Sequence, residues 1–225
     1  MSNSYERYHQ ASSWPPVQKD EHGERVTDET YRHVIPLKYD ENIVTKLSNC
    51  ILARKSKKAI EIHPEMDITH IGTLLKWAVG VHDDEQHRRA YPSAGALYPN
   101  EIYVAVKEAK NIESGLYQYL LKDHALAWVS RHHEIEDAFV QTDIDFNVCV
   151  IVAADLAEST RCYGERGYRF CLLEAGHIVQ NIMLVASALH QSVAPIGGFK
   201  DDIINEKILP GNKNLTAFYL VPIGR

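Results

Sequence analysis

The chain has 225 residues, of which 45% are hydrophobic and 24% are charged, a composition typical of one globular domain and outside the disordered range. Its formal net charge is -6, so nucleic acid is not expected as a partner, because neutralising phosphates requires a broad basic face. The four cysteines show no CxxC spacing and the N-terminus has no apolar signal segment. We therefore predict a reducing, cytoplasmic location.

The first 40 residues differ in character from the rest of the chain. They are polar, contain three prolines and have no sustained hydrophobic period. We interpret residues 1–40 as an ordered but irregular N-terminal arm, and residues 41–225 as a single domain.

Two helices open this domain. Apolar residues recur at helical intervals from Glu41 to about Lys57. Asp67 is expected to cap a second helix, which ends at Gly80. A charged loop, 82–89, follows. Three strands rich in β-branched and aromatic residues are then predicted at 102–106, 115–121 and 125–129.

The second half of the domain centres on a nearly continuous apolar run, FNVCVIVAA at 146–154. Such a run predicts a central strand covered on both faces. A long helix is expected at 165–190, where Glu174 and other polar side chains interrupt the apolar sequence and argue against a membrane span. The remaining predicted elements are an extended segment at 192–195, a helix at 201–209 and a closing strand at 215–222.

Cations and a hydroxyl lie together at the end of the first helix, in ARKSKK. The members of this group are Arg54, Lys55, Ser56 and Lys58. Charge-assisted hydrogen bonds from such a group can hold a phosphate. The alternative is that these cations are simply favoured near a helix C-terminus.

Two turns of small residues offer backbone donors to a planar ligand, because residues without a large side chain allow close approach. The first contains Pro92, Ser93, Ala94 and Gly95, and the second, after Pro195, contains Ile196, Gly197 and Gly198. Each has a structural alternative, in which the first turn only reverses the chain and the two glycines only supply a positive φ.

The stretches YPSAGALYPNEIYV and YGERGYRFCLLEAGHIVQNIMLVASALHQSVAPIGGF together resemble the SagB-type (ThcOx-like) dehydrogenases. These are the azoline-oxidising branch of the FMN-dependent nitroreductase superfamily. The resemblance implies an α+β, nitroreductase-like fold, with a central mixed β-sheet flanked by helices. It also implies a domain-sharing homodimer with two FMN sites across the interface.

The resemblance gives roles to these residues. Arg54, Ser56 and Lys58 match a superfamily element that contacts FMN, and Arg225 stands where family members have a phosphate-binding arginine. The 92–95 turn matches one that approaches the flavin from the partner subunit, where the Ser93 hydroxyl can bond a pyrimidine edge. At the second turn a backbone N–H can meet flavin N5.

The catalytic pair departs from the family pattern. Azoline oxidases usually have Lys-Tyr where this chain has Cys162 and Tyr163. Tyr163 is the candidate for the proton step. A thiol near its free pKa is mostly neutral at pH 7 and cannot replace an ammonium charge, although a lowered pKa would make it a base.

A polar stripe on the long helix consists of Glu174, His177 and Asn181, spaced to share one face. We interpret it as a hydrogen-bonded seam at a dimer interface. Metal binding by Glu-x-x-His is the alternative. Residues 41–225 contain no second such pair, so no metal is predicted.

Three functions are compatible with these residues. The first is FMN-dependent dehydrogenation of thiazoline or oxazoline rings to azoles in a ribosomally made peptide, with cyclase-complex proteins as partners. The second, motivated by Cys162, is an NAD(P)H-dependent nitroreductase or ene-reductase. The third is a catalytically silent scaffold of a peptide-modifying complex.

Overall fold

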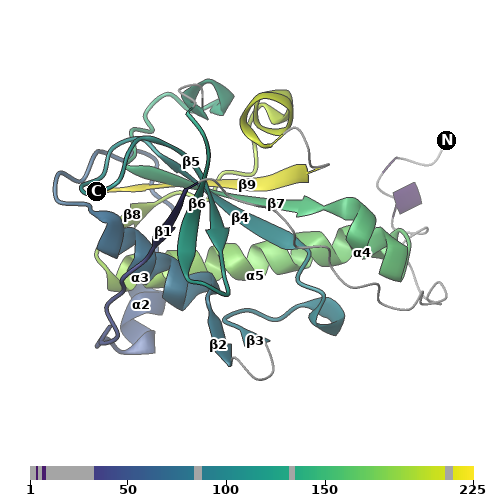
Figure 1. Ribbon diagram of the computed structural model, residues 1–225, viewed down its shortest axis with the longest axis horizontal. Helices are drawn as coiled ribbons and strands as arrows, with labels where there is room; N and C mark the ends of the chain where they lie inside the picture. The colour runs from purple at the N-terminus through teal and green to yellow at the C-terminus, as the bar shows by residue number, and fades with distance from the viewer. Residues whose placement is uncertain (1–3, 5–6, 9–32, 84–87, 132–134, 211–214) are drawn as a thin grey trace.

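A seven-stranded sheet forms the centre of the computed structural model, which describes residues 4, 7–8, 33–83, 88–131, 135–210 and 215–225. Its strand order is β1 (Val34–Pro36), β6 (Ala125–Ser130), β5 (Gly115–Leu120), β4 (Asn100–Val106), β7 (Val148–Asp155), β9 (Leu215–Gly224) and β8 (Ser192–Val193). Helices cover one face, and two short helical turns lie on the other (Figure 1).

β7 is the central strand that its apolar run predicted. It pairs with β4 on one side and β9 on the other, and its residues from Val148 to Ala154 are buried. Alternate side chains enter two different cores: Val148, Val150 and Val152 pack on the helical face, whereas Cys149, Ile151 and Ala153 pack on the opposite face. The period of two residues along a strand produces this division.

The helical face carries α3 (Ile68–Val79) and α5 (Arg166–Ala188). As expected, Asp67 caps α3 by accepting hydrogen bonds from the Thr69 and His70 backbones, and Gly80 ends it. α5 is long and apolar enough to cross a membrane by length and composition alone. It packs against the sheet and α3, however, so its apolar side belongs to the protein core.

Several elements differ from the sequence-based expectation. The first helix, α2 (Leu47–Ala53), is shorter than predicted. Where a charged loop was predicted at 82–89, two short strands pair antiparallel: β2 (Val81–Asp83) and β3 (Arg88–Arg89). Residues 84–87 between them lie outside the described residues. A separate helix, α4 (Leu156–Tyr163), precedes α5 because Asp155 caps it and Gly164, at φ 55°, ends it.

The sheet is also more regular than the mixed sheet that was expected. All of its ladders in the described residues are antiparallel, and parallel pairing occurs only at two isolated bridges. Most of the predicted N-terminal arm lies outside the described residues. Its end, 34–36, forms the edge strand β1, and the helix predicted at 201–209 is a π-helical turn, η3 (Ile203–Ile208).

Candidate functional site

The turn that precedes β4 is held in a strained conformation. Gly95, Ala96 and Tyr98 all have positive φ angles, of 58°, 54° and 51°, a region that side-chain-bearing residues rarely adopt. The Tyr98 backbone N–H donates to Ser93 Oγ over 2.8 Å, which closes the turn. Strain of this kind persists only where surrounding contacts enforce it, and it is often found at functional sites.

Tyr163 lies directly against this turn. The Tyr163 hydroxyl lies where a Cβ on Gly95 would be placed, so a larger residue there would make the phenol turn aside, and the positive φ itself favours glycine. The Tyr163 ring meets Phe170 edge-on, with 5.0 Å between the centroids. Burial raises the pKa of Tyr163, with a further contribution from Cys162. The phenol is therefore protonated at neutral pH.

Cys162 has a different environment from its neighbour. Its side chain is 1% exposed and packed in the interior. A residue in this position contributes to packing on the inner side of α4. This location gives no support to the prediction that Cys162 takes part in catalysis.

Behind the turn, the buried side chain of Glu174 connects α5 to β4. Its Oε1 accepts hydrogen bonds from the backbone N–H of Asn100 at 3.2 Å and from Asn100 Nδ2 at 3.1 Å. Burial raises the pKa of Glu174, and hydrogen bonds from Ser93 and Asn100, together with the charge of Arg89, oppose that rise. Asn100 has no motif that marks this contact, because it lies 74 positions from Glu174 in the sequence.

The expectation of an intersubunit seam is therefore corrected for two of its three residues. Glu174 binds Asn100, and Asn181 Nδ2 donates to the Ala78 and Ala90 carbonyls at 3.1 and 2.9 Å, all within one chain. His177 is exposed. Among the described residues, no group of three or more His, Cys, Asp or Glu side chains is arranged to hold a metal ion.

The cationic residues lie at the other end of the sheet. The Lys57 backbone N–H donates to the Val193 carbonyl of β8 over 3.0 Å, and Glu61 and Arg225 exchange two backbone hydrogen bonds. These contacts bring the 54–58 segment close to the chain end at Arg225. Arg54 is half-buried, and Lys55, Ser56, Lys58 and Arg225 are exposed.

The second small-residue turn lies between these two ends. The Ile196 backbone N–H donates to Leu220 O over 2.8 Å, so it is already paired within the chain. Gly197 and Gly198 are exposed and do not have the positive φ that the structural alternative required. A Cβ on Gly198 would meet nothing within 4 Å, and one on Gly197 would make only an ordinary contact with Tyr219, at 3.7 Å.

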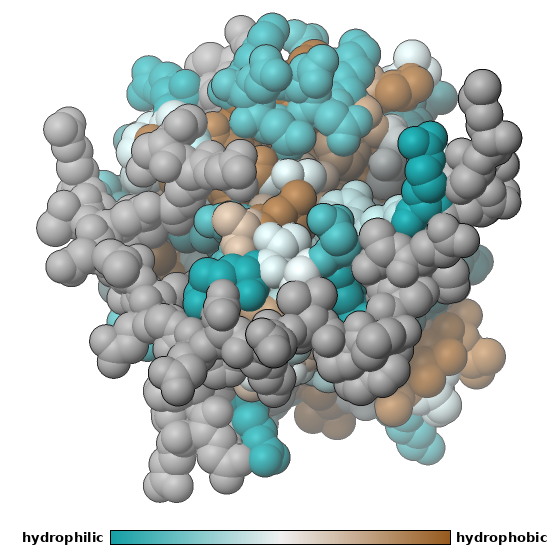
Figure 2. All heavy atoms as spheres, turned by 90° about the vertical axis from the view of Figure 1, so that its right-hand side faces the viewer, coloured by the Kyte–Doolittle hydropathy of each residue, from teal (hydrophilic) through white to brown (hydrophobic). Residues whose placement is uncertain are grey.

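The 92–95 turn and the cationic residues thus lie at opposite ends of the strands, with the 196–198 turn between them. Asn100, next to the 92–95 turn, pairs with Ala154, whereas Ile223, next to the chain end, pairs with Val148. On β7 the two paired residues, Ala154 and Val148, are six positions apart, and that length of strand is about 20 Å. Figure 2 views the molecule from the α4 end, where apolar and weakly polar residues lie at the centre of the face and hydrophilic ones gather above them.

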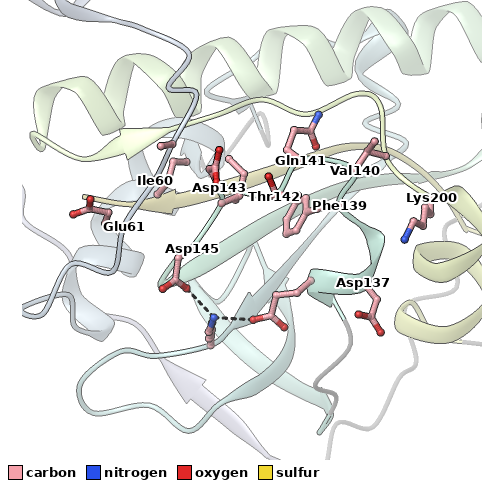
Figure 3. Close-up of a pocket in the computed structure, with 14 residues that line it drawn as sticks. Ile60, Glu61, Asp137, Phe139, Val140, Gln141, Thr142, Asp143, Asp145 and Lys200 are labelled. Atoms are coloured by element: carbon pink, nitrogen blue, oxygen red, sulfur yellow. Dashed lines mark hydrogen bonds and ion pairs between the residues drawn. The ribbon is translucent and has the colours of Figure 1, made fainter.

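A hollow of 670 Å³ lies on the face opposite α5 and borders the cationic end, because Ala59 and Glu61 line it (Figure 3). Phe139, Val140 and Ile60 line it together with several carboxylates, two of which bind Lys107: Glu136 and Asp145, each at 2.8 Å. None of the predicted site residues lines this hollow. We therefore place the candidate site at the two small-residue turns and the cationic end.

Comparison with known proteins gives consistent similarities. Residues 51–225 match the model of the nitroreductase family. The chain is 33% identical over 185 residues to MJ1384 of Methanocaldococcus jannaschii, which is named as a nitroreductase; the match covers 80% of this chain and 91% of MJ1384.

Two further similarities involve peptide processing. The chain is 29% identical over 154 residues to the microcin B17-processing protein McbC of Escherichia coli, covering 62% of this chain but only 55% of McbC. The E. coli microcin synthetase McbBCD complex, solved with truncated pro-MccB17 bound, contains a chain of similar fold. Its TM-score is 0.67 at 23% identity, and the match covers 91% of this chain and 79% of that chain.

Proposed function

Because this chain belongs to the nitroreductase family, we propose that it is an FMN-dependent oxidoreductase, and that it dehydrogenates thiazoline or oxazoline rings in a ribosomally made peptide. The observation that carries the proposal is that about 20 Å of strand separates the 92–95 turn from the cationic residues. One group is suited to a phosphate and the other to a planar ring. Each is therefore half of a site that two subunits complete.

The residues present fit FMN. Arg54, Ser56, Lys58 and Arg225 would hold the phosphate, because guanidinium and ammonium groups form charge-assisted hydrogen bonds to it. No atom of the chain lies within 4 Å of a Cβ placed on Gly198, so the protein's own packing leaves room for a larger side chain at this position. A cofactor bound against the turn would need that room. FMN, when bound, would supply a hydride acceptor.

The same separation supports a homodimer. Large apolar side chains lie exposed on α2, among them Leu52, which is 82% exposed, and Leu47. Leu172 and Leu173 are exposed on α5. Apolar surface of this kind is typical of protein interfaces. We expect these two helices to bury it against a second copy of the chain, so that the turn of one subunit approaches the cationic group of the other.

Tyr163 is the residue of this chain that we assign to the proton step. Its hydroxyl adjoins the 92–95 turn, so both would serve the same composite site. Azoline oxidation removes a proton and a hydride from adjacent carbons, and the neutral Tyr163 hydroxyl would hydrogen-bond the ring while a solvent water accepts the proton. Cys162 is buried, and we assign it to packing.

The similarity to McbC and to the McbBCD fold supports a peptide substrate and cyclase-complex partners. The four cysteines are unpaired and buried. A reducing cytoplasm suits that state. Because the match covers only 55% of McbC, the activity of the whole relative is carried over here as a proposal.

One observation favours a second candidate, reduction of a nitro compound or an activated alkene with NAD(P)H. A phenol whose pKa is raised by burial is a better proton donor than a proton acceptor at neutral pH. Reduction needs a donor, and azoline oxidation needs an acceptor.

Two measurements test the proposal and separate its candidates. Purified protein should show flavin absorbance, either as isolated or after FMN is added; its absence would refute both candidates. Under anaerobic conditions, an azoline-containing peptide should bleach the flavin if the first candidate is correct. Rapid bleaching by NAD(P)H, with no response to the azoline peptide, would support the second candidate instead.

A further inference from the structure

The strained turn before β4, residues 92–98, needs contacts that hold it in place. Ala96 and Tyr98 have φ angles of 54° and 51°, where the Cβ atom crowds the backbone. Residues in this region relax toward ordinary angles unless their surroundings prevent it. Inside the turn, the hydrogen bond from the Tyr98 N–H to Ser93 Oγ opposes that relaxation. Further contacts come from β3.

Arg89, the last residue of β3, lies over the Tyr98 ring. The guanidinium carbon is 4.2 Å from the ring centroid, a distance at which a cation and an aromatic face attract each other. The Arg89 backbone N–H also donates to the Tyr98 hydroxyl over 3.4 Å. Both the side chain and the backbone of Arg89 therefore hold the ring of Tyr98.

Arg89 is itself tied to the interior of the protein. Its Nη1 donates to the Tyr91 hydroxyl over 2.9 Å, and the Tyr91 side chain is 2% exposed within the core of the helical face. Tyr91 also meets Tyr98 edge-on, with 5.6 Å between the ring centroids. The backbone N–H of Ala90 donates to the Gly80 carbonyl at the end of α3. We call Arg89, Tyr91 and Tyr98 the tyrosine clamp.

The planar shape of the guanidinium is what this clamp uses. One flat group stacks on the Tyr98 ring and donates to Tyr91 at the same time. An ammonium is a compact point charge, and it cannot present a flat face and a directed edge together. Arg89→Lys would therefore keep the positive charge and lose the geometry of the clamp.

We propose that Arg89 is a positioning residue that holds the turn before β4 in its ligand-binding conformation before the ligand arrives. This inference rests on the proposed function, in which the turn meets the ring of FMN. The contacts of the clamp form within one chain and need no ligand. A turn that is ordered in advance loses less conformational freedom on binding, which favours a high affinity.

A loosened clamp should change one rate constant of binding and not the other. A ligand binds only to the fraction of molecules whose turn is in the competent conformation, and its apparent affinity falls with that fraction. Loosening the clamp lowers this fraction in the free protein, so association slows. Dissociation stays the same because the turn has one conformation once the ligand is bound. Loss of a direct contact with the flavin would instead accelerate dissociation.

The test follows the quenching of flavin fluorescence after rapid mixing of the apoprotein with FMN, so no turnover is required. Arg89→Lys should lower the association rate constant about tenfold and leave the dissociation rate constant within about twofold of wild type. Tyr91→Phe removes only the oxygen to which Arg89 donates and should slow association about threefold. Riboflavin, which has the ring and no phosphate, should be slowed by the same factors as FMN.

Arg88→Lys is the matched control. Arg88 precedes Arg89 in the same strand and is exposed, so this variant should keep both rate constants. The melting temperature of each variant is measured in parallel. A lower melting temperature of Arg89→Lys with both rate constants unchanged would show a merely structural role and overturn the inference.

Faster dissociation of FMN from Arg89→Lys with unchanged association would also overturn the inference, because Arg89 would then be a contact of the flavin. In both cases FMN binding, and with it the proposed function, would stand. Should Arg89→Lys not fold, an unchanged association rate constant in Tyr91→Phe would overturn the inference equally. Wild type that fails to bind FMN would refute the proposed function as well.

Discussion

Gly95→Ala tests how the candidate site is built, because two separate costs meet at this position. The first is conformational: Gly95 has φ 58°, and an alanine in the left-handed region costs about 1–2 kcal/mol. The second is steric, because the new Cβ would collide with the Tyr163 hydroxyl. Because the hydroxyl is the far end of a flexible, half-exposed side chain, turning it aside should cost less than about 1 kcal/mol.

The two costs can be separated with Tyr163→Phe. This change removes the hydroxyl that the Cβ would meet, and the next atom, Cζ of Tyr163, lies 3.5 Å from the Cβ position, an ordinary contact. In a Gly95→Ala/Tyr163→Phe double variant the steric cost should disappear and the conformational cost should remain. The double-mutant cycle should therefore give a small coupling energy, below about 1 kcal/mol, because only the movable phenol end contributes to it.

The assay is urea denaturation followed by circular dichroism, with all four proteins measured under one condition. Gly198→Ala is the control, since its Cβ meets nothing, and it should change the free energy of unfolding by less than about 0.5 kcal/mol. A Gly95→Ala variant as stable as wild type would refute the conformational cost assigned to φ 58° at this position.

Three further predictions concern other parts of the chain. Burial, with a smaller contribution from the Lys76 charge, lowers the pKa of His124 to about 4 from its usual 6.5. Between these two pH values the imidazole is protonated in the unfolded chain but not in the folded one. The free energy of unfolding should therefore decrease as the pH falls from 6.5 to 4. His124→Asn, which tolerates the native φ of 45°, should flatten that slope in a urea titration across pH, and an unchanged slope would contradict the assignment. Asn181→Ala should destabilise the fold by about 1–3 kcal/mol, because the carbonyls of Ala78 and Ala90 lose their partner, whereas His177→Ala on the exposed side should have little effect on the same melts. Gly198→Val should leave the melting temperature unchanged yet weaken FMN binding at least tenfold by fluorescence titration; equal affinity would place the flavin elsewhere.

Local signals in the sequence determined many of the elements. Asp67 and Gly80 mark the ends of α3 correctly because a cap and a stop act through bonds to nearby residues. The apolar run at 146–154 predicts the central strand correctly, because burial on both faces leaves no polar alternation. α4 was missed because its eight residues have few apolar positions and its start depends on a single capping carboxylate.

The residue types of the candidate site were also readable from the sequence, including the small-residue turns, the cationic segment and Tyr163. Their grouping was not. Pairing along β4, β7 and β9 places the 92–95 turn and the chain end at opposite ends of the strands, and strand register is a property of the whole sheet. Glu174 illustrates the same limit, because helical periodicity assigned it to a face but could not supply Asn100, 74 positions away, as its partner. The sequence by itself determined which chemistry is available, and only the tertiary structure decided which groups meet, because contacts between distant segments depend on how the complete chain packs.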